Sequence, residues 1–127
     1  MAKRALVIDD SRAMRTILGG ILTDLGFAVT DAEDGERALE TLRRCGPFEL
    51  ALVDWNMPLM SGFDFVCVVR RDSEFDGMRL MMVTTETEIE RMADALEAGA
   101  DEYIMKPFSK EMLLEKLKLL GIGPKNH

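Results

Sequence analysis

The sequence predicts an α/β fold in which a parallel β-sheet is covered by helices on both faces. Two observations support this prediction. Short apolar runs alternate along the chain with longer stretches whose apolar residues recur at the 3.6-residue period of a helix. The short runs are apolar at consecutive positions, which is typical of strands that are buried on both faces of a parallel sheet. Alternating strands and helices favour parallel pairing, because a parallel pair needs a crossover connection.

The first half of the chain contains three predicted strands, which are residues 5–8, 27–30 and 50–53. Ser11 is a suitable N-cap for the first helix, which ends at Gly26. The apolar stripe of this helix consists of Met14, Ile17, Leu18, Ile21, Leu22 and Leu25. The second helix covers residues 34–45 and ends at the Gly46-Pro47 break. Its inner face is predicted to consist of Ala38, Leu42 and Cys45.

The second half continues the same alternation, with strands at residues 80–83 and 103–105. A loop with Pro58 and Gly62 leads into a helix whose apolar positions are Phe63, Val66 and Val69. The next helix covers residues 87–98 and ends at Gly99. Its inner side is predicted to consist of Ile89, Met92, Ala93 and Leu96. Ser109 caps the last helix, whose periodic residues are Met112, Leu113, Leu117 and Leu120.

Composition restricts the classes of protein that fit. The chain has 127 residues, of which 47% are hydrophobic and 31% charged, as expected for one packed soluble domain. A net charge of -7 disfavours nucleic acid or a membrane surface as partner and is compatible with a bound cation. No apolar run approaches the ~18 residues of a membrane span. Cys45 and Cys67 lack metal-site spacing, and the single histidine is His127, so we expect free buried thiols in the cytoplasm.

Polar side chains follow four of the five predicted strands. Asp9 and Asp10 follow the first strand, Asp54 the third, Thr84 the fourth and Lys106 the fifth. In an open parallel sheet, ligands bind beyond the carboxyl ends of the strands, where the strand order reverses. If the first and third strands are neighbours, three carboxylates converge at that edge, and Lys106 can pair with Asp54.

Three converging carboxylates require compensation. Two unit charges ~5 Å apart repel by ~3 kcal/mol at an effective dielectric constant of ~20. Either one carboxylate is protonated or a cation lies among them, and a small set of oxygen ligands with room for water suits Mg²⁺. Each residue alone has an ordinary structural explanation, such as a helix cap for Asp10 or β-propensity for Thr84. Their conjunction at one edge of the sheet favours a functional site.

The order and spacing of these residues resemble the receiver domain of bacterial two-component response regulators. The similarity rests on the paired acids after the first strand, on Asp54, on Thr84 and on Lys106-Pro107-Phe108. The segments "VDWNMPLMSGFDF" and "AGADEYIMKPF" are most similar to single-domain chemotaxis-type regulators. The resemblance implies a flavodoxin-like, doubly wound five-stranded sheet of order 2-1-3-4-5 with five helices. It also implies that residues 1–127 form a receiver domain, with its core in about residues 3–120 and no output domain.

The resemblance implies a role for each site residue. Asp54 is expected to accept a phosphoryl group from the phosphohistidine of a histidine kinase. The expected Mg²⁺ ligands are Asp10 and Asp54 directly, Asp9 through water and the backbone carbonyl of Asn56. Thr84 is expected to hydrogen-bond the phosphoryl group and Lys106 to form an ion pair with it. The Lys106-Pro107 peptide bond is expected to be cis.

The resemblance also implies an output. Phosphorylation is expected to move Thr84 and to turn Tyr103 inward, which changes the face formed by the fourth helix, the fifth strand and the fifth helix. The candidate residues of this face are Ile89, Met92, Tyr103 and Lys116. Asn56 and Glu86, two residues beyond Asp54 and Thr84, are expected to tune the hydrolysis of the acyl phosphate, and Thr85 to narrow the approach to Asp54.

The expected partners are a kinase and a downstream protein in chemotaxis or motility, with the chain a monomer or a phosphorylation-dependent dimer. Beyond its own phosphotransfer and slow dephosphorylation, no enzymatic turnover is expected. Alternatives are a phosphorelay shuttle, a module that acts without phosphorylation, a phosphatase of the haloacid-dehalogenase type and a flavin- or nucleotide-binding protein. The phosphatase would need a D-x-D element, whereas Asp9 and Asp10 are adjacent, and no phosphate-cradling Gly-rich loop follows the first strand.

Overall fold

A five-stranded parallel sheet forms the centre of the structure, a computed structural model that describes residues 3–123. The strands are β1 (Lys3–Ile8), β2 (Phe27–Ala32), β3 (Leu50–Asp54), β4 (Arg79–Thr84) and β5 (Glu102–Met105). Their order in the sheet is β2-β1-β3-β4-β5, with every pair parallel. This order confirms the expected topology and places the reversal of strand order between β1 and β3.

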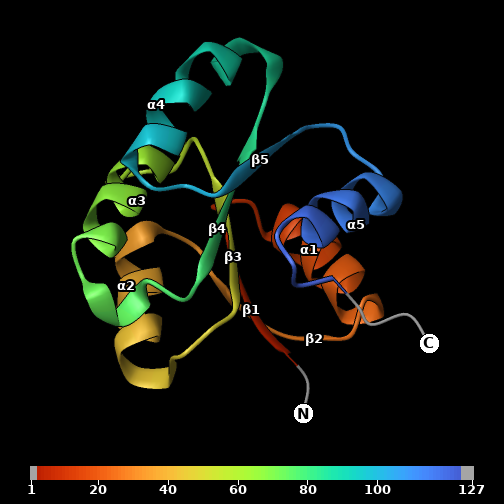
Figure 1. Cartoon of the computed structure of the whole chain (residues 1–127), viewed down its shortest axis with the longest axis horizontal. Coiled ribbons are helices and arrows are strands. Elements are labelled where there is room, and N and C mark those ends of the chain that lie inside the picture. The colour runs from red at the N-terminus through yellow and green to blue at the C-terminus, as the bar shows by residue number, and fades with distance from the viewer. Residues whose placement is uncertain (1–2, 124–127) are drawn as a thin grey trace.

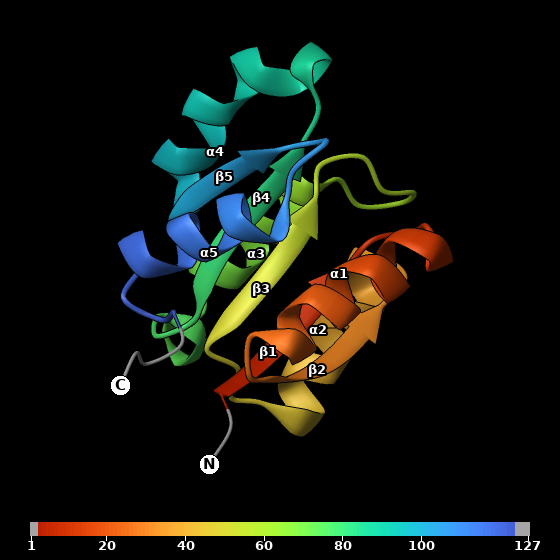
Figure 2. The ribbon, with the colours of Figure 1, turned by 90° about the vertical axis from the view of Figure 1, so that its right-hand side faces the viewer.

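Helices cover both faces of the sheet. The α-helices are α1 (Arg12–Asp24), α2 (Gly35–Cys45), α3 (Gly62–Arg70), α4 (Met92–Ala98) and α5 (Lys110–Leu119), and the 3-10 helices are η1 (Ser73–Phe75) and η2 (Glu86–Arg91). In Figure 1, α2, α3 and α4 lie on one side of the strands and α1 and α5 on the other. Figure 2 shows the same arrangement with α1 and α5 in front of the sheet. No helix within residues 3–123 combines the length and apolarity needed to cross a membrane.

Side-chain caps fix where the helices begin. The hydroxyl of Ser11 accepts a hydrogen bond from the backbone N–H of Met14 at the start of α1. Ser109 does the same for Met112 at the start of α5. Both caps were predicted from the sequence, and each satisfies a backbone donor that has no partner within its helix.

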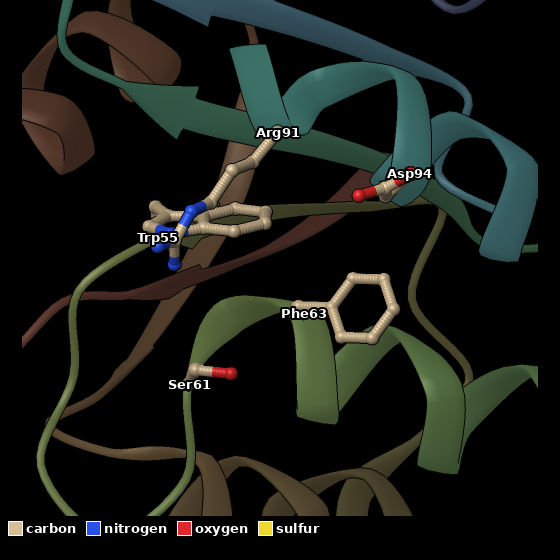
Figure 3. A pocket seen from close by; sticks show the side chains of 5 residues that line it. All are labelled: Trp55, Ser61, Phe63, Arg91 and Asp94. Atoms are coloured by element: carbon tan, nitrogen blue, oxygen red, sulfur yellow. The ribbon is translucent and has the colours of Figure 1, made fainter. Parts of the chain in front are cut away.

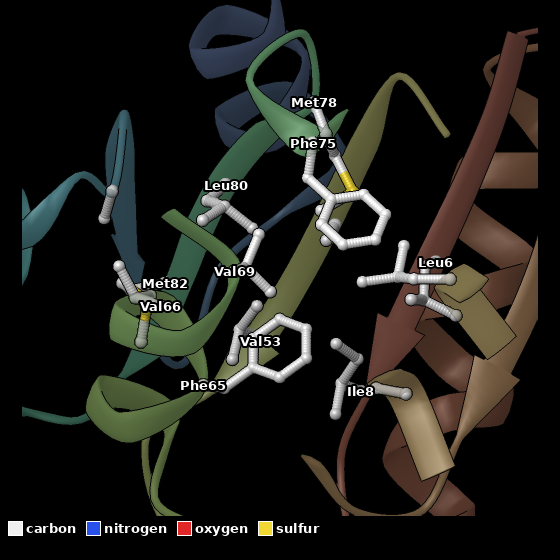
Figure 4. Close-up of a cluster of buried hydrophobic side chains, with 14 of the residues drawn as sticks. Leu6, Ile8, Val53, Phe65, Val66, Val69, Phe75, Met78, Leu80 and Met82 are labelled. Carbon is white, nitrogen blue, oxygen red and sulfur yellow. The ribbon is translucent and has the colours of Figure 1, made fainter. Parts of the chain in front are cut away.

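Two hydrophobic clusters hold the layers together, one on each face of the sheet. Along β1, Leu6 and Ile8 face the cluster beneath α2, α3 and α4, while Ala5 and Val7 face the cluster beneath α1 and α5. Figure 4 shows the first cluster, in which Phe65 of α3 lies against β1 and β3. Successive strand side chains point to opposite faces, so a strand that is buried on both sides must be apolar at every position.

The predicted inner face of the fourth helix is wrong in part. Met92 and Ala95 are buried, whereas Ala93 and Leu96 are exposed. The segment begins with the 3-10 helix η2, which has three residues per turn, so Ile89 and Met92 align at a spacing of three and the buried side of α4 continues through Ala95. The 3.6-residue period that we applied to the whole segment does not hold in its first turns.

Two cysteine predictions and one apolar-stripe prediction also need correction. Cys45 and Cys67 are free, as expected, but Cys45 is exposed and Cys67 only half-buried. Cys45 is the last residue of α2, and the buried residues of that helix are Gly35, Ala38, Leu39 and Leu42. In α1, Ile17 is 54% exposed although it belongs to the apolar stripe, because α1 buries Leu18 and Leu22 instead. His127 lies outside the described residues.

Candidate functional site

Three carboxylates meet at the carboxyl edge of the sheet. Asp9 and Asp10 leave the end of β1, and Asp54 is the last residue of β3. The two strands are neighbours, with Ile8 opposite Val53, so the residues that follow them arrive side by side. One carboxylate oxygen from each of the three aspartates lies within 4.8 Å of those of the other two. The predicted convergence is therefore present.

Asp9 is held in place by its neighbours. Its Oδ1 accepts a hydrogen bond from the backbone N–H of Ser11 at 2.8 Å. Arg15 of α1 donates to the backbone carbonyl of Asp9 at 2.8 Å and forms an ion pair with Asp31 Oδ2 at 3.0 Å. The sequence analysis missed Arg15, whose only signal was its place one helical turn after the Ser11 cap. It ties the loop of the acidic pocket to the end of β2.

Lys106 supplies the positive charge in this pocket. Its Nζ lies 3.4 Å from Asp54 Oδ1 and 3.7 Å from Asp9 Oδ2. The backbone N–H of Lys106 donates to the carbonyl of Thr84 at 2.7 Å, which joins the end of β4 to the segment after β5. The expected cis bond between Lys106 and Pro107 is present.

The electrostatics of the pocket favour a cation. Burial raises the pKa of Asp54 from 3.8 to about 6; repulsion from Asp9 adds to the rise, Lys106 opposes it, and Asp10 contributes a smaller increase. Asp9 is 1% exposed and Asp54 8% exposed, so water screens little of this repulsion. One lysine does not compensate three converging carboxylates.

The donor set fits a hard divalent cation. Within residues 3–123, Asp9 Oδ2 is the buried side-chain oxygen that has no hydrogen-bond partner. A buried carboxylate oxygen without a donor is costly unless a cation or water completes it. Carboxylate oxygens in small number are the ligands that Mg²⁺ takes in proteins, usually with several waters kept. Asp9, Asp10 and Asp54 therefore match the expected ion in chemistry and proximity.

Thr84 and Asn56 meet at a residue that the sequence analysis did not select. Thr84 is 1% exposed, and its Oγ1 lies 3.3 Å from Glu88 Oε1. The side-chain amide of Asn56 donates to Glu88 Oε2. Glu86 is exposed, and its expected role in tuning acyl-phosphate hydrolysis stays a prediction. A sequence signal for Glu88 existed in the T-x-x-E spacing from Thr85, because the two residues form a capping box at the start of η2.

The start of α3 packs closely against the backbone of Asp54. The N–H of Gly62 donates to the carbonyl of Trp55 at 2.9 Å. A Cβ atom on Gly62 would lie 2.5 Å from the carbonyl oxygen of Asp54, which explains why glycine is required here. Leu59 at the tip of the loop is 85% exposed and has a φ of 69°, a conformation that non-glycine residues seldom adopt.

A cavity of about 290 Å³ opens beside this loop. Figure 3 shows the residues that line it: Ser61 and Phe63 at the start of α3, Arg91 and Asp94 from the segment of η2 and α4, and Trp55, which the Arg91 side chain overlaps in this view. The rings of Trp55 and Phe63 are tilted, with centroids 6.2 Å apart. The cavity thus lies between the residue that follows Asp54 and the segment that follows Thr84.

The candidate output residues differ in exposure. Tyr103 is half-buried against the cluster beneath α3 and α4, and the Nζ of Lys116 lies 4.9 Å from its ring centroid. Lys116 also pairs with Glu102 at 3.0 Å. Ile89 is half-buried, and Met92 is 2% exposed and belongs to the core, as the prediction of an inner helix side had it, so Met92 is no longer a candidate for the output face. The helix face that Met92 shares with Ala95 is the one that packs on the sheet.

Comparison with known proteins agrees with this geometry. Residues 5–118 match the model of the response regulator receiver domain. The chain is 41% identical over 115 residues to the chemotaxis protein CheY-3 of Vibrio cholerae, which covers 90% of this chain and 88% of that protein. It is 42% identical over 118 residues to the chemotaxis protein CheY1 of Helicobacter pylori, covering 92% and 95%.

Among solved structures, that of the chemotaxis response regulator CheY4 of Vibrio cholerae superposes with a TM-score of 0.87 at 35% identity. The superposition covers 94% of this chain and 99% of that one. The strand order, the acidic pocket at the carboxyl edge and these similarities lead to one conclusion. This chain belongs to the family of response regulator receiver domains.

Proposed function

We propose that this protein accepts a phosphoryl group on Asp54 from the phosphohistidine of a histidine kinase and thereby controls a downstream protein. The observation that carries the proposal is the meeting of three carboxylates, within 4.8 Å of one another, with the ammonium of Lys106 at 3.4 Å from Asp54 Oδ1. Asp54 is proposed as the acceptor because Lys106 lies closer to it than to Asp9, at 3.4 Å against 3.7 Å, and because the backbone N–H of Ser11 already occupies one oxygen of Asp9. The similarity to chemotaxis proteins supports a role in chemotaxis or motility.

The transfer is an in-line displacement at phosphorus. A carboxylate oxygen of Asp54 attacks, the P–N bond to the imidazole breaks with its electron pair left on nitrogen, and an aspartyl phosphate forms. Lys106 neutralises negative charge on the phosphoryl oxygens, and the Thr84 hydroxyl donates to one of them. Asp54 must be ionised to attack, and with its pKa raised to about 6 most of the carboxylate is ionised at about pH 7.

Asp9, Asp10 and Asp54 would hold a Mg²⁺ ion, and the carbonyl of Asn56 is proposed as a further ligand. When bound, Mg²⁺ supplies charge neutralisation at the phosphoryl oxygens and favours the ionised form of Asp54. Asp9 is held by Ser11 and Arg15, so its carboxylate is positioned before any ligand arrives. The proposal needs no substrate pocket beyond this edge, because the donor is another protein.

The acceptor role is tested by labelling. Purified protein is incubated with Mg²⁺ and radiolabelled acetyl phosphate, and the label per chain is counted before and after treatment with hydroxylamine, which cleaves acyl phosphates. We expect one label per chain that hydroxylamine releases, and none on Asp54→Asn. The matched control is Asp76→Asn. Asp76 is an exposed aspartate that directly follows the 3-10 helix η1. Stoichiometric label on the Asp54→Asn variant would refute the proposal.

The output is proposed to be a shift in the face formed by α4, β5 and α5. Tyr103 is half-buried at this face beneath Lys116, so a change in the packing of its side chain alters the surface that a partner protein contacts. Thr84, which ends β4 next to β5, links the phosphoryl group to this change. NMR spectra with and without beryllofluoride, an acyl-phosphate mimic, test the shift. Unchanged signals around Tyr103 and α4 would exclude it.

A further inference from the structure

Glu88 connects the two chain segments that border the phosphoacceptor. Asn56 follows β3, and its side-chain amide donates to Glu88 Oε2. Thr85 follows β4, and its backbone N–H and its hydroxyl donate to Glu88 Oε1 at 3.1 and 3.0 Å. Thr84, the last residue of β4, has its hydroxyl 3.3 Å from the same oxygen. One carboxylate therefore accepts hydrogen bonds from both strand ends beside Asp54.

The Thr84 hydroxyl is already engaged in this arrangement. It lies 3.3 Å from Glu88 Oε1 and 3.3 Å from the carbonyl oxygen of Thr85. A hydroxyl has a single proton, so it cannot donate to these acceptors and to a phosphoryl oxygen at the same time. Thr84 is 1% exposed, which leaves the protein acceptors as its partners. A phosphoryl group that recruits this hydroxyl takes it from Glu88 and Thr85.

Charge opposes the same arrangement once Asp54 is phosphorylated. The pocket already contains the carboxylates of Asp9, Asp10 and Asp54, with Lys106 as the cation that contacts two of them. A phosphoryl group has a charge of about -1.5 to -2 at neutral pH. It would compete with the Glu88 carboxylate for the proton of the Thr84 hydroxyl. Like charges that share a donor repel, so a phosphoryl group on Asp54 would weaken the contact between Glu88 and Thr84.

We propose that Glu88 is a positioning residue that holds Thr84 and Asn56 in the unphosphorylated arrangement and that phosphorylation has to displace it. The inference rests on the proposed phosphorylation of Asp54. Glu88 belongs to η2, which leads directly into α4, so its release transmits the change at Thr84 to α4. Loss of the Glu88 charge therefore favours the arrangement of the phosphorylated protein.

Glu88→Gln tests the proposal against Glu90→Gln. Gln keeps an oxygen that can accept from Thr85 N–H, so the capping box is retained while the negative charge is lost. Glu90 lies on the same 3-10 helix and is exposed, so its substitution removes an equal charge nearby without touching Thr84 or Asn56. The probe is beryllofluoride, which is titrated into the protein at saturating Mg²⁺. Binding is followed by the fluorescence of Trp55, the single tryptophan, which follows Asp54 directly.

We expect Glu88→Gln to lower the Kd for beryllofluoride by at least about fivefold, the lower range of coupling between linked sites. Glu90→Gln should leave the Kd unchanged. Glu88→Ala, which also removes the hydrogen bonds, should tighten binding at least as much, whereas mere loss of the cap would leave binding unchanged or weaken it. If both Glu88 variants bound beryllofluoride with the wild-type Kd or a higher one, the role of Glu88 would be overturned. A decrease in Kd for Glu90→Gln as large as that for Glu88→Gln would overturn it too.

The same titration separates this inference from the proposed function. Wild-type protein that binds beryllofluoride and accepts label on Asp54, together with unchanged Glu88 variants, would overturn the role of Glu88 alone. Wild-type protein that shows neither property would overturn the phosphoacceptor function, and the role of Glu88 with it.

Discussion

Lys106 Nζ lies 3.4 Å from Asp54 Oδ1, although 52 residues separate the two side chains along the sequence. The same ammonium is 3.7 Å from Asp9 Oδ2, so one cation faces two buried carboxylates. This shortage of positive charge connects the stability of the fold to pH and to metal binding, because each additional proton or cation relieves repulsion in the pocket. The first two predictions follow from it.

Asp54 should make the protein less stable as pH rises. Burial raises its pKa in the folded state to about 6, whereas the unfolded chain titrates near 3.8. Between these values the folded state binds a proton that the unfolded state has lost, so the free energy of unfolding falls as pH increases through this window. We expect Asp54→Asn to stabilise the protein by about 2 kcal/mol more at about pH 7 than at about pH 4.

Urea unfolding in EDTA measures this difference, because divalent ions would change the pKa of Asp54. Asp76→Asn is the control, because it removes the same charge at an exposed position outside the acidic pocket. Equal stabilisation by Asp54→Asn at both pH values would contradict the prediction.

Mg²⁺ should stabilise the folded protein through Asp9, Asp10 and Asp54. A ligand that binds only the folded state contributes about 2.7 kcal/mol at a concentration of 100 times its Kd. Asp10 is the exposed member of the cluster, so Asp10→Asn should leave the fold intact in EDTA. We expect it to remove most of the rise in Tm that saturating MgCl₂ produces in the wild type. Differential scanning calorimetry with and without Mg²⁺ measures the effect, and an equal rise in both proteins would exclude Asp10 as a ligand.

Gly62 and Gly20 should respond in opposite directions to alanine. A Cβ on Gly62 would lie 2.5 Å from the carbonyl oxygen of Asp54 and 3.0 Å from Trp55 Cα, so the backbone has to shift. We expect Gly62→Ala to destabilise the protein by about 1–3 kcal/mol, the usual range for overpacking, and to slow labelling of Asp54. Among residues 3–123, no atom beyond the backbone of its own helix and its chain neighbours lies within 4 Å of a Cβ added to Gly20, so Gly20→Ala should stabilise by about 0.5–1 kcal/mol.

Chemical denaturation of both glycine variants gives the two values. The Gly19-Gly20 pair has no evident packing role, because a Cβ on Gly19 would make an ordinary contact at 3.6 Å with Val29. A stability loss in Gly20→Ala would show that α1 needs this glycine for another reason.

Arg70 should be a structural residue that the site does not use. Its guanidinium donates to the carbonyl oxygens of Phe75, Met78 and Gly99 and pairs with Asp101 at 2.9 Å. Arg70→Met keeps the aliphatic stem but leaves half-buried carbonyls without donors, so we expect a loss of about 2–4 kcal/mol. Arg70→Lys should recover only part of it, because an ammonium cannot reproduce the planar fork of donors. Labelling of the folded fraction should match wild type, and a specific labelling defect would contradict this assignment.

The strand ends could be identified from the sequence because their signal is local. The apolar run of residues 50–53 ends at Asp54, and that of residues 5–8 ends at Asp9, so the position of each acid follows from where a buried strand must stop. Parallel strands present their carboxyl ends at one edge, and the acids converge there because β1 and β3 are neighbours in the sheet. The Ser11 and Ser109 caps are equally local and were correct.

The buried faces of the helices were predicted less well, because they depend on the rotational position of each residue around the helix axis. The 3-10 geometry of η2 placed Ala95 inside and Leu96 outside, and the end of α2 left Cys45 exposed. The first outcome depends on where the 3-10 turns of η2 give way to the α-helix and the second on where α2 ends, and a periodic pattern specifies neither position.

By itself the sequence determined the order of elements, the sheet edge that bears the chemistry and the residues that end there. Only the tertiary structure decided which side chains meet across that edge: Glu88 contacts Asn56, and Arg15 supports Asp9. The physical reason is that a hydrogen bond needs its atoms within a few tenths of an ångström, and that precision comes from helices packed on a sheet, not from the propensities of neighbouring residues.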